Sequence, residues 1–146
     1  AKEFANKSLE LDPEQNMALS AMAIVFEGEA KWKELLDISQ FALNLDEDDS
    51  EFLNYIAIAH LNLDNLDEAY TNLKKALAID ELDDSSWYNL ACYYALKGEK
   101  QNAIDKLTVA IHLDDVGTAE SMADDPMLDG IKDTPEFIRL LEIDTL

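Results

Sequence analysis

The stretch WYNLACYYALKGEKQNAIDKLTVAIHLD, residues 87–114, decides the fold. Its first half places apolar residues at the spacing of one helical face, namely Trp87, Leu90, Ala91 and Tyr94. Its second half does the same with Ala103, Leu107, Ala110 and Ile111. Gly98 stands between the halves, where the first helix should end. The stretch therefore predicts two antiparallel helices, with alanines where the two backbones approach most closely.

The same pattern recurs when the chain is shifted along itself by 34 residues. One column is alanine throughout, at Ala23, Ala57 and Ala91, and another is aspartate, at Asp12, Asp46, Asp80 and Asp114. We therefore divide the chain into three full units, 16–49, 50–83 and 84–117. Residues 1–15 match the closing helix of a preceding unit, and the tail 118–146 breaks the period.

These residues resemble the tetratricopeptide repeat, through Trp87-x2-Leu90-Ala91-x2-Tyr94 followed by Ala103-x3-Leu107-x2-Ala110. The resemblance implies an all-α fold, an α-solenoid of antiparallel helix pairs wound into a right-handed superhelix. The first unit departs from the pattern at Leu35 and Ser39, and the second at His60 and Asp64. We expect these departures to change local packing and not the fold.

The tail contains DDPMLDGIKDTPEFIRLL, which resembles a closing segment found after many bacterial tetratricopeptide arrays. Thr134 and Pro135 read as the N-cap and first turn of a helix whose apolar edge holds Phe137, Leu140 and Leu141. A solenoid's last helix exposes an apolar face that such a tail would cover. The N-terminal end has no such cover, so we expect further repeats before this fragment in the parent protein.

The charge of the chain excludes several classes of partner. It carries 32 acidic and 11 basic residues, a net charge of −21, which disfavours nucleic acid and anionic membranes. A basic or apolar protein segment is the partner that this charge allows. No apolar run reaches membrane-spanning length, and one cysteine forms no internal disulfide. We interpret the chain as cytoplasmic.

Catalysis would have to rest on Cys92 and the two histidines, and the pattern favours a structural role for the cysteine. His60 falls in a core column and His112 on a different helix from Cys92, so no base is placed beside the thiol. The acidic runs at 46–52 and 80–86 lack the glycine and glutamate positions of an EF-hand loop. We read them as helix caps and turns, and we expect no enzyme activity, metal or cofactor.

A second stripe runs beside the core stripe in each first helix. We call it the inner stripe; its members are Ser20, Ile24, Glu27, Asn54, Ile58, Leu61, Tyr88, Cys92 and Ala95. The tetratricopeptide resemblance implies that this face lines a concave peptide-binding groove. The alternative is that Ile24, Ile58 and Cys92 pack between neighbouring units. The stripe has no Lys or Arg, so it does not form the clamp that grips the acidic tails of heat-shock chaperones.

The sequence thus favours a non-catalytic protein–protein interaction module that holds an apolar or basic segment. Two alternatives stay open within the binding class. One is a chaperone-like role, in which the stripe shields an apolar segment of a client. The other is a self-associating scaffold, in which the N-terminal helix pairs with a second copy.

Overall fold

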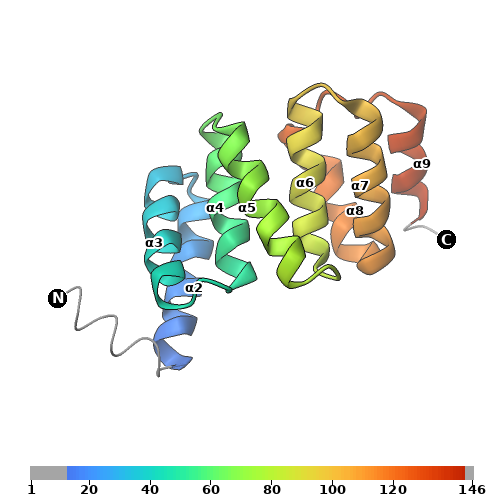
Figure 1. Cartoon of the computed structure of the whole chain (residues 1–146). Coiled ribbons are helices and arrows are strands. Elements are labelled where there is room, and N and C mark those ends of the chain that lie inside the picture. The colour runs from blue at the N-terminus through green and yellow to red at the C-terminus, as the bar shows by residue number, and fades with distance from the viewer. Residues whose placement is uncertain (1–12, 144–146) are drawn as a thin grey trace. The chain divides into compact units, whose positions relative to one another are not determined.

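The computed structural model describes residues 13–143, all of whose regular elements are helices (Figure 1). These residues belong to two compact units, one ending at Ile79 and the other beginning at Asp80. The first unit holds α2 (Pro13–Gly28), α3 (Trp32–Leu45), α4 (Ser50–Asn62) and α5 (Leu66–Ile79). The second holds α6 (Asp84–Leu96), α7 (Lys100–Leu113), α8 (Asp115–Asp124), the 3₁₀ turn η1 (Pro126–Leu128) and α9 (Pro135–Ile143). The all-α expectation is confirmed.

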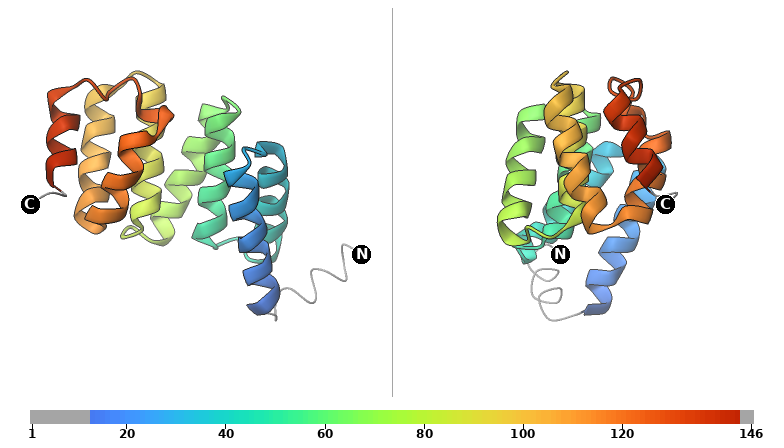
Figure 2. Two further views of the ribbon diagram at one scale, coloured as in Figure 1. Left: turned by 180° about the vertical axis from the view of Figure 1, so that it is seen from behind. Right: turned by 90° about the vertical axis from the view of Figure 1, so that its right-hand side faces the viewer.

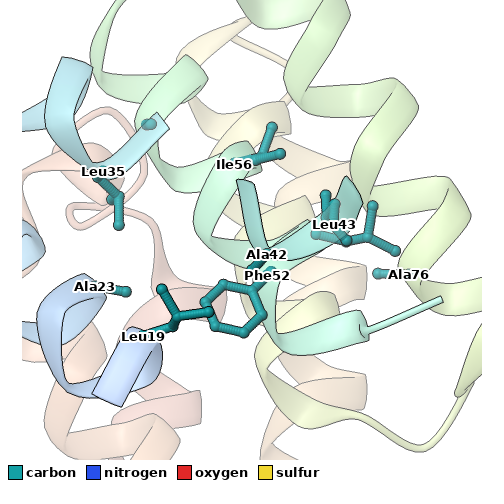
Figure 3. Close-up of a cluster of buried hydrophobic side chains, with 10 residues drawn as sticks. Leu19, Ala23, Leu35, Ala42, Leu43, Phe52, Ile56 and Ala76 are labelled. Atoms are coloured by element: carbon teal, nitrogen blue, oxygen red, sulfur yellow. The ribbon is translucent and has the colours of Figure 1, made fainter. Parts of the chain in front are cut away.

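The first unit is built from consecutive helices that pack against one another, α2 on α3, α3 on α4 and α4 on α5. Its core is one cluster in which Leu19 of α2 and Phe52 of α4 point toward each other, beside Ala42 of α3 (Figure 3). Ala23 and Ala42 are buried where helices approach closely, as the repeat pattern predicts. Phe52 is completely buried, so the α4 face toward this cluster is closed to solvent.

Two aspartates cap the helices that open the second and third repeats. The Asp49 carboxylate accepts from the backbone N–H of Glu51 at 3.0 Å, and Asp83 accepts from that of Ser85 at 3.2 Å. Each bond satisfies a backbone donor that the first helical turn leaves free. Burial raises the pKa of Asp49 more than its bond to the Glu51 N–H lowers it. The acidic runs therefore do act as caps.

One left-handed residue separates the paired helices in every repeat, always at the same repeat position. Ala30, Asp64 and Gly98 have φ values of 57°, 64° and 79°, and they are spaced 34 residues apart. Only glycine adopts this conformation without a steric cost from its Cβ atom. The position predicted for Gly98 is confirmed, and Ala30 and Asp64 hold the same turn under strain.

The second unit pairs α6 with α7 and then folds the tail back over them. Helix α8 packs on α7, η1 packs on α6, and α9 packs on α8 and α7. In the rear view of Figure 2, α8 and the turn after it lie in front of α6. Thr134 Oγ1 accepts from the Phe137 N–H at 3.2 Å, so the predicted N-cap of α9 is confirmed. Leu128, Ile131 and Phe137 are buried, and the tail thus carries part of this unit's core.

The start of α2 differs from the repeat boundary expected at residue 16. Helix α2 begins at Pro13, three residues before that boundary. The closing helix expected within residues 1–15 otherwise lies outside the described residues.

The two departures in the first repeat exchange volume across one helical turn. Leu35 and Ser39 of α3 are both fully buried, whereas the third repeat has Ala103 and Leu107 at the same positions. In the first repeat the leucine comes first and the small residue follows four positions later. In the third repeat the order is reversed. The Ser39 hydroxyl has no hydrogen-bond partner in this apolar site. The expectation that these departures leave the fold intact is confirmed.

Candidate partner-binding stripe

The α2 part of the inner stripe combines one solvent-exposed isoleucine with two polar residues that reach α4. Ile24 is 58% exposed. Ser20 donates its hydroxyl proton to the Glu51 carboxylate at 2.8 Å. Glu27 lies near enough to Tyr55 for its charge to help raise the pKa of that phenol. Ile24 is therefore the α2 stripe residue whose apolar surface is open to a ligand.

The exposed apolar surface of α2 is wider than the stripe. Met17, Ala18, Ala21, Met22 and Val25 are exposed as well. At about 100° of rotation per residue these five residues and Ile24 form one continuous face. The opposite side of the helix carries the buried Leu19 and Ala23. Helix α2 thus has an apolar face toward its own core and a second apolar face toward solvent.

The α4 part of the stripe is more enclosed. Asn54 is buried, and its side-chain amide donates to the Ser50 carbonyl at 3.0 Å. Ile58 is half-buried and packs against the core cluster of the first unit, while Leu61 is buried. An asparagine whose amide is already bonded within its own helix is poorly placed to grip a peptide carboxylate.

The α6 part of the stripe is covered by the chain's own tail. The Tyr88 hydroxyl donates to Asp125 Oδ2 at 2.6 Å, and the Cys92 Sγ lies 3.9 Å from the same oxygen. Cys92 is only 1% exposed and Ala95 is buried. A Cβ atom added to Gly130 would lie 3.8 Å from the Ala95 carbonyl oxygen, so the tail also approaches the last turn of α6 closely.

Cys92 is held as a thiol. Burial above all, and then the Asp125 carboxylate, raise the pKa of Cys92 well above its usual value. Burial also raises the pKa of Tyr88, with contributions from Cys92 and Asp125. A cysteine nucleophile needs its thiolate form and an accessible sulfur, and Cys92 has neither. This geometry supports the structural reading of the cysteine.

Metal sites and membrane-spanning helices were also considered for the described residues. Between Pro13 and Ile143 no group of three or more His, Cys, Asp or Glu side chains is arranged to hold a metal ion. Over the same range none of the helices combines the length and the apolar character needed to cross a membrane. His60 is half-buried, and its Nδ1 lies 3.3 Å from the Asn65 side-chain nitrogen.

Asp125 is the site residue that sequence reasoning missed. Its place before Pro126 is a common turn signal, and its Oδ1 does accept from the Met127 N–H at 2.9 Å. The bond from Tyr88 joins residues 37 apart in the chain. Such a long-range contact has no periodic signature, because it depends on how the tail folds over α6.

Comparison with known proteins identifies the fold. No protein-family model matches the chain, and no curated protein does. Solved structures do match. The Yersinia enterocolitica type III secretion chaperone SycD, in complex with a peptide of the translocator YopD, has a TM-score of 0.63 at 18% identity, covering 92% of this chain and 95% of SycD. The first tetratricopeptide domain of Spaghetti (RPAP3), bound to the HSP90 peptide SRMEEVD, has a TM-score of 0.65 at 12% identity, covering 94% and 96%.

A third similar structure is an enzyme, the Thermobaculum terrenum O-GlcNAc transferase, with a TM-score of 0.65 at 23% identity. The match covers 73% of this chain but only 22% of the transferase. Together these likenesses show that the chain has the helical solenoid fold of tetratricopeptide proteins. The fold expected from the repeat pattern is confirmed.

Proposed function

We propose that this chain is a non-catalytic protein-interaction module that binds an apolar or basic segment of a partner protein on the inner stripe, with Ile24 of α2 as its most accessible contact. The observation that carries this proposal is the second apolar face of α2, on which Met17 and Ile24 are 70% and 58% exposed. Contiguous exposed apolar surface of this kind is typical of interaction sites in soluble proteins.

The net charge of the chain limits the class of partner segment further. At a net charge of −21, the chain attracts basic segments over distances longer than any contact and repels acidic ones. Two structures with this fold hold peptides, one of a translocator and one of HSP90. The stripe of this chain lacks Lys and Arg, so an acidic tail would find no cation there. We place the module in the cytoplasm as part of the same proposal.

The test compares two isoleucines that are both exposed. Ile24→Asp adds a charge to the stripe, and Ile138→Asp adds the same charge on α9, where Ile138 is 47% exposed and outside the stripe. Each variant and the unaltered chain would be immobilised and used to capture proteins from a native lysate. Circular dichroism would first confirm equal helix content.

We expect Ile24→Asp to lose a partner that the unaltered chain and Ile138→Asp both retain. Equal capture by all three proteins would contradict binding through Ile24. Light scattering at several protein concentrations would show whether the captured partner is a second copy of the chain, which is the self-association alternative.

A chaperone-like role is favoured by one specific feature, the two exposed methionines of α2. Met17 and Met22 are 70% and 45% exposed, and flexible thioether side chains adapt to apolar partners of different shape. In this version the module shields an apolar client segment from aggregation. Suppression of client aggregation that falls in a Met17→Ser, Met22→Ser variant would support it, and unchanged suppression would contradict it.

A further inference from the structure

The tail follows α6 in a defined direction. Asp125 lies against Tyr88 and Cys92 in the middle of the helix, and Gly130 lies against the carbonyl of Ala95 near its end. The segment 125–130 therefore runs parallel to α6, from its second turn to its last. Two inner-stripe residues of α6, Tyr88 and Cys92, contact Asp125, and the backbone carbonyl of the third, Ala95, lies close to Gly130.

The contact combines two chemistries. Asp125 Oδ2 accepts the Tyr88 hydroxyl proton at 2.6 Å, while Oδ1 accepts the Met127 N–H and holds the η1 turn. Leu128, three residues after Asp125, is completely buried. One carboxylate thus fixes the turn and anchors it to α6, and the leucine supplies the buried apolar area. A hydrogen bond to a charged acceptor is stronger than one between neutral groups.

We propose that the inner face of α6 is a recognition site for an Asp-Pro-x-Leu turn, and that in this chain residues 125–128 occupy it as an intramolecular ligand. The Tyr88 hydroxyl binds the carboxylate of the turn, and the apolar side of the turn packs on the surface around Cys92 and Ala95. The tail must leave before a segment from another molecule can bind to α6. This inference rests on the proposed function only in treating the inner stripe as a binding surface. The ligand on α6 differs from the basic or apolar segment proposed above, because the Tyr88 hydroxyl, and not a cation, binds its carboxylate against the repulsion of a net charge of −21.

Cys92 provides a direct readout, because it is the only cysteine and lies beneath the tail. A thiol reagent such as Ellman's reagent reacts with it when the segment 125–130 opens, so the reaction rate reports the open population. The experiment uses the full chain with Asp125→Ala, and with Asp124→Ala as the matched control. Asp124 is the exposed neighbour, and its loss changes the net charge equally.

We expect Asp125→Ala to raise the thiol reaction rate about tenfold to a hundredfold, and Asp124→Ala to leave it within about twofold. Tyr88→Phe removes only the phenolic hydroxyl and should raise the rate as well. It serves as the second variant if Asp125→Ala lowers the helix content measured by circular dichroism. Equal rates for Asp125→Ala, Tyr88→Phe and the control would overturn the proposal.

Recognition in trans is tested with the octapeptide DDPMLDGI, which has the sequence of residues 124–131. At about millimolar concentration it should slow the thiol reaction of the Asp125→Ala chain, because it takes the place of the weakened tail. The peptide DAPMLDGI should not. If neither peptide slows the reaction, the α6 face does not recognise the turn. Because no partner protein takes part, this result is independent of the capture experiment with Ile24→Asp.

Discussion

Helices α2 and α6 occupy the same repeat position and carry the same stripe, yet one stripe is open and the other is covered. Ile24 on α2 is 58% exposed, while Cys92, its equivalent 68 residues later, is 1% exposed. The tail folds back on α6, where Asp125 bonds to Tyr88 and the η1 turn, which contains the buried Leu128, packs on the helix. The comparison teaches that a repeat position does not by itself set exposure, because exposure depends on what packs on that position.

The comparison also separates the roles that we propose for the two faces. The α2 face presents exposed apolar side chains in a strongly acidic chain, which suits a partner. The α6 face is used within the molecule, where the Tyr88–Asp125 bond and the buried Leu128 hold the tail.

The largest effect should come from the exchanged pair in α3. Leu35→Ala should lower the free energy of unfolding by roughly 3–5 kcal/mol, because it leaves a cavity at a fully buried site. Ser39→Leu alone should cost roughly 1–3 kcal/mol by overpacking. The double variant has the Ala and Leu order of the third repeat, so it should cost less than the sum of the two. Urea unfolding of the unaltered chain, the two single variants and the double variant measures these free energies. If the loss in the double variant equals the sum of the two single losses, the two positions do not compensate each other in volume.

Shortening a side chain to alanine should lower the free energy of unfolding much more in the tail that covers α6 than on the exposed face of α2. Leu128→Ala should lower the free energy of unfolding by about 2–4 kcal/mol, because Leu128 is completely buried and belongs to the η1 turn that packs on α6. Ile24→Ala should change it by less than about 0.5 kcal/mol, because Ile24 already faces solvent. Denaturant titration of the two variants checks the difference. Similar losses for both would mean that α2 is covered in solution.

Exchanging alanine and glycine at the left-handed position should change the free energy of unfolding in opposite directions in the first and third repeats. Ala30→Gly removes a strained Cβ atom at φ 57° and should raise the free energy of unfolding by about 0.5–1 kcal/mol, after the entropy cost of glycine. Gly98→Ala introduces the same strain at φ 79° and should lower it by a similar amount. Thermal unfolding followed by circular dichroism gives both values. Destabilisation by both variants would show that the turn in the first repeat is not strained.

The smallest effect concerns pH and the polar contacts between α2 and α4. Burial, followed by the charges of Glu51 and Glu27, raises the pKa of Tyr55 to about 12. The unfolded chain releases this proton near pH 10, so the contribution of Tyr55 to stability is complete below pH 10 and is lost as the pH rises toward 12. Tyr55→Phe should lose less stability over this interval than the unaltered chain. Parallel pH profiles for the two proteins would contradict the raised pKa.

Local features of the fold were predictable from single residues. Gly98 marks the end of α6, and Thr134 caps α9, because turn and cap preferences depend on the residue and its nearest backbone. For the candidate site, the sequence predicted which positions form the inner stripe but not their exposure or contacts. The bond from Tyr88 to Asp125 was not, since nothing in the repeat period relates a helix position to a residue in the aperiodic tail.

The helix pairs, their 34-residue period and the turn at Gly98 follow from the sequence, because they depend on side-chain spacing and backbone preferences along the chain. Only the tertiary structure decided which parts of the inner stripe face solvent. Burial is a property of everything that packs around a residue, and Asp125, which contacts Cys92, lies more than thirty residues away in the chain. Ile24 and Cys92 therefore share one repeat position and have different surroundings.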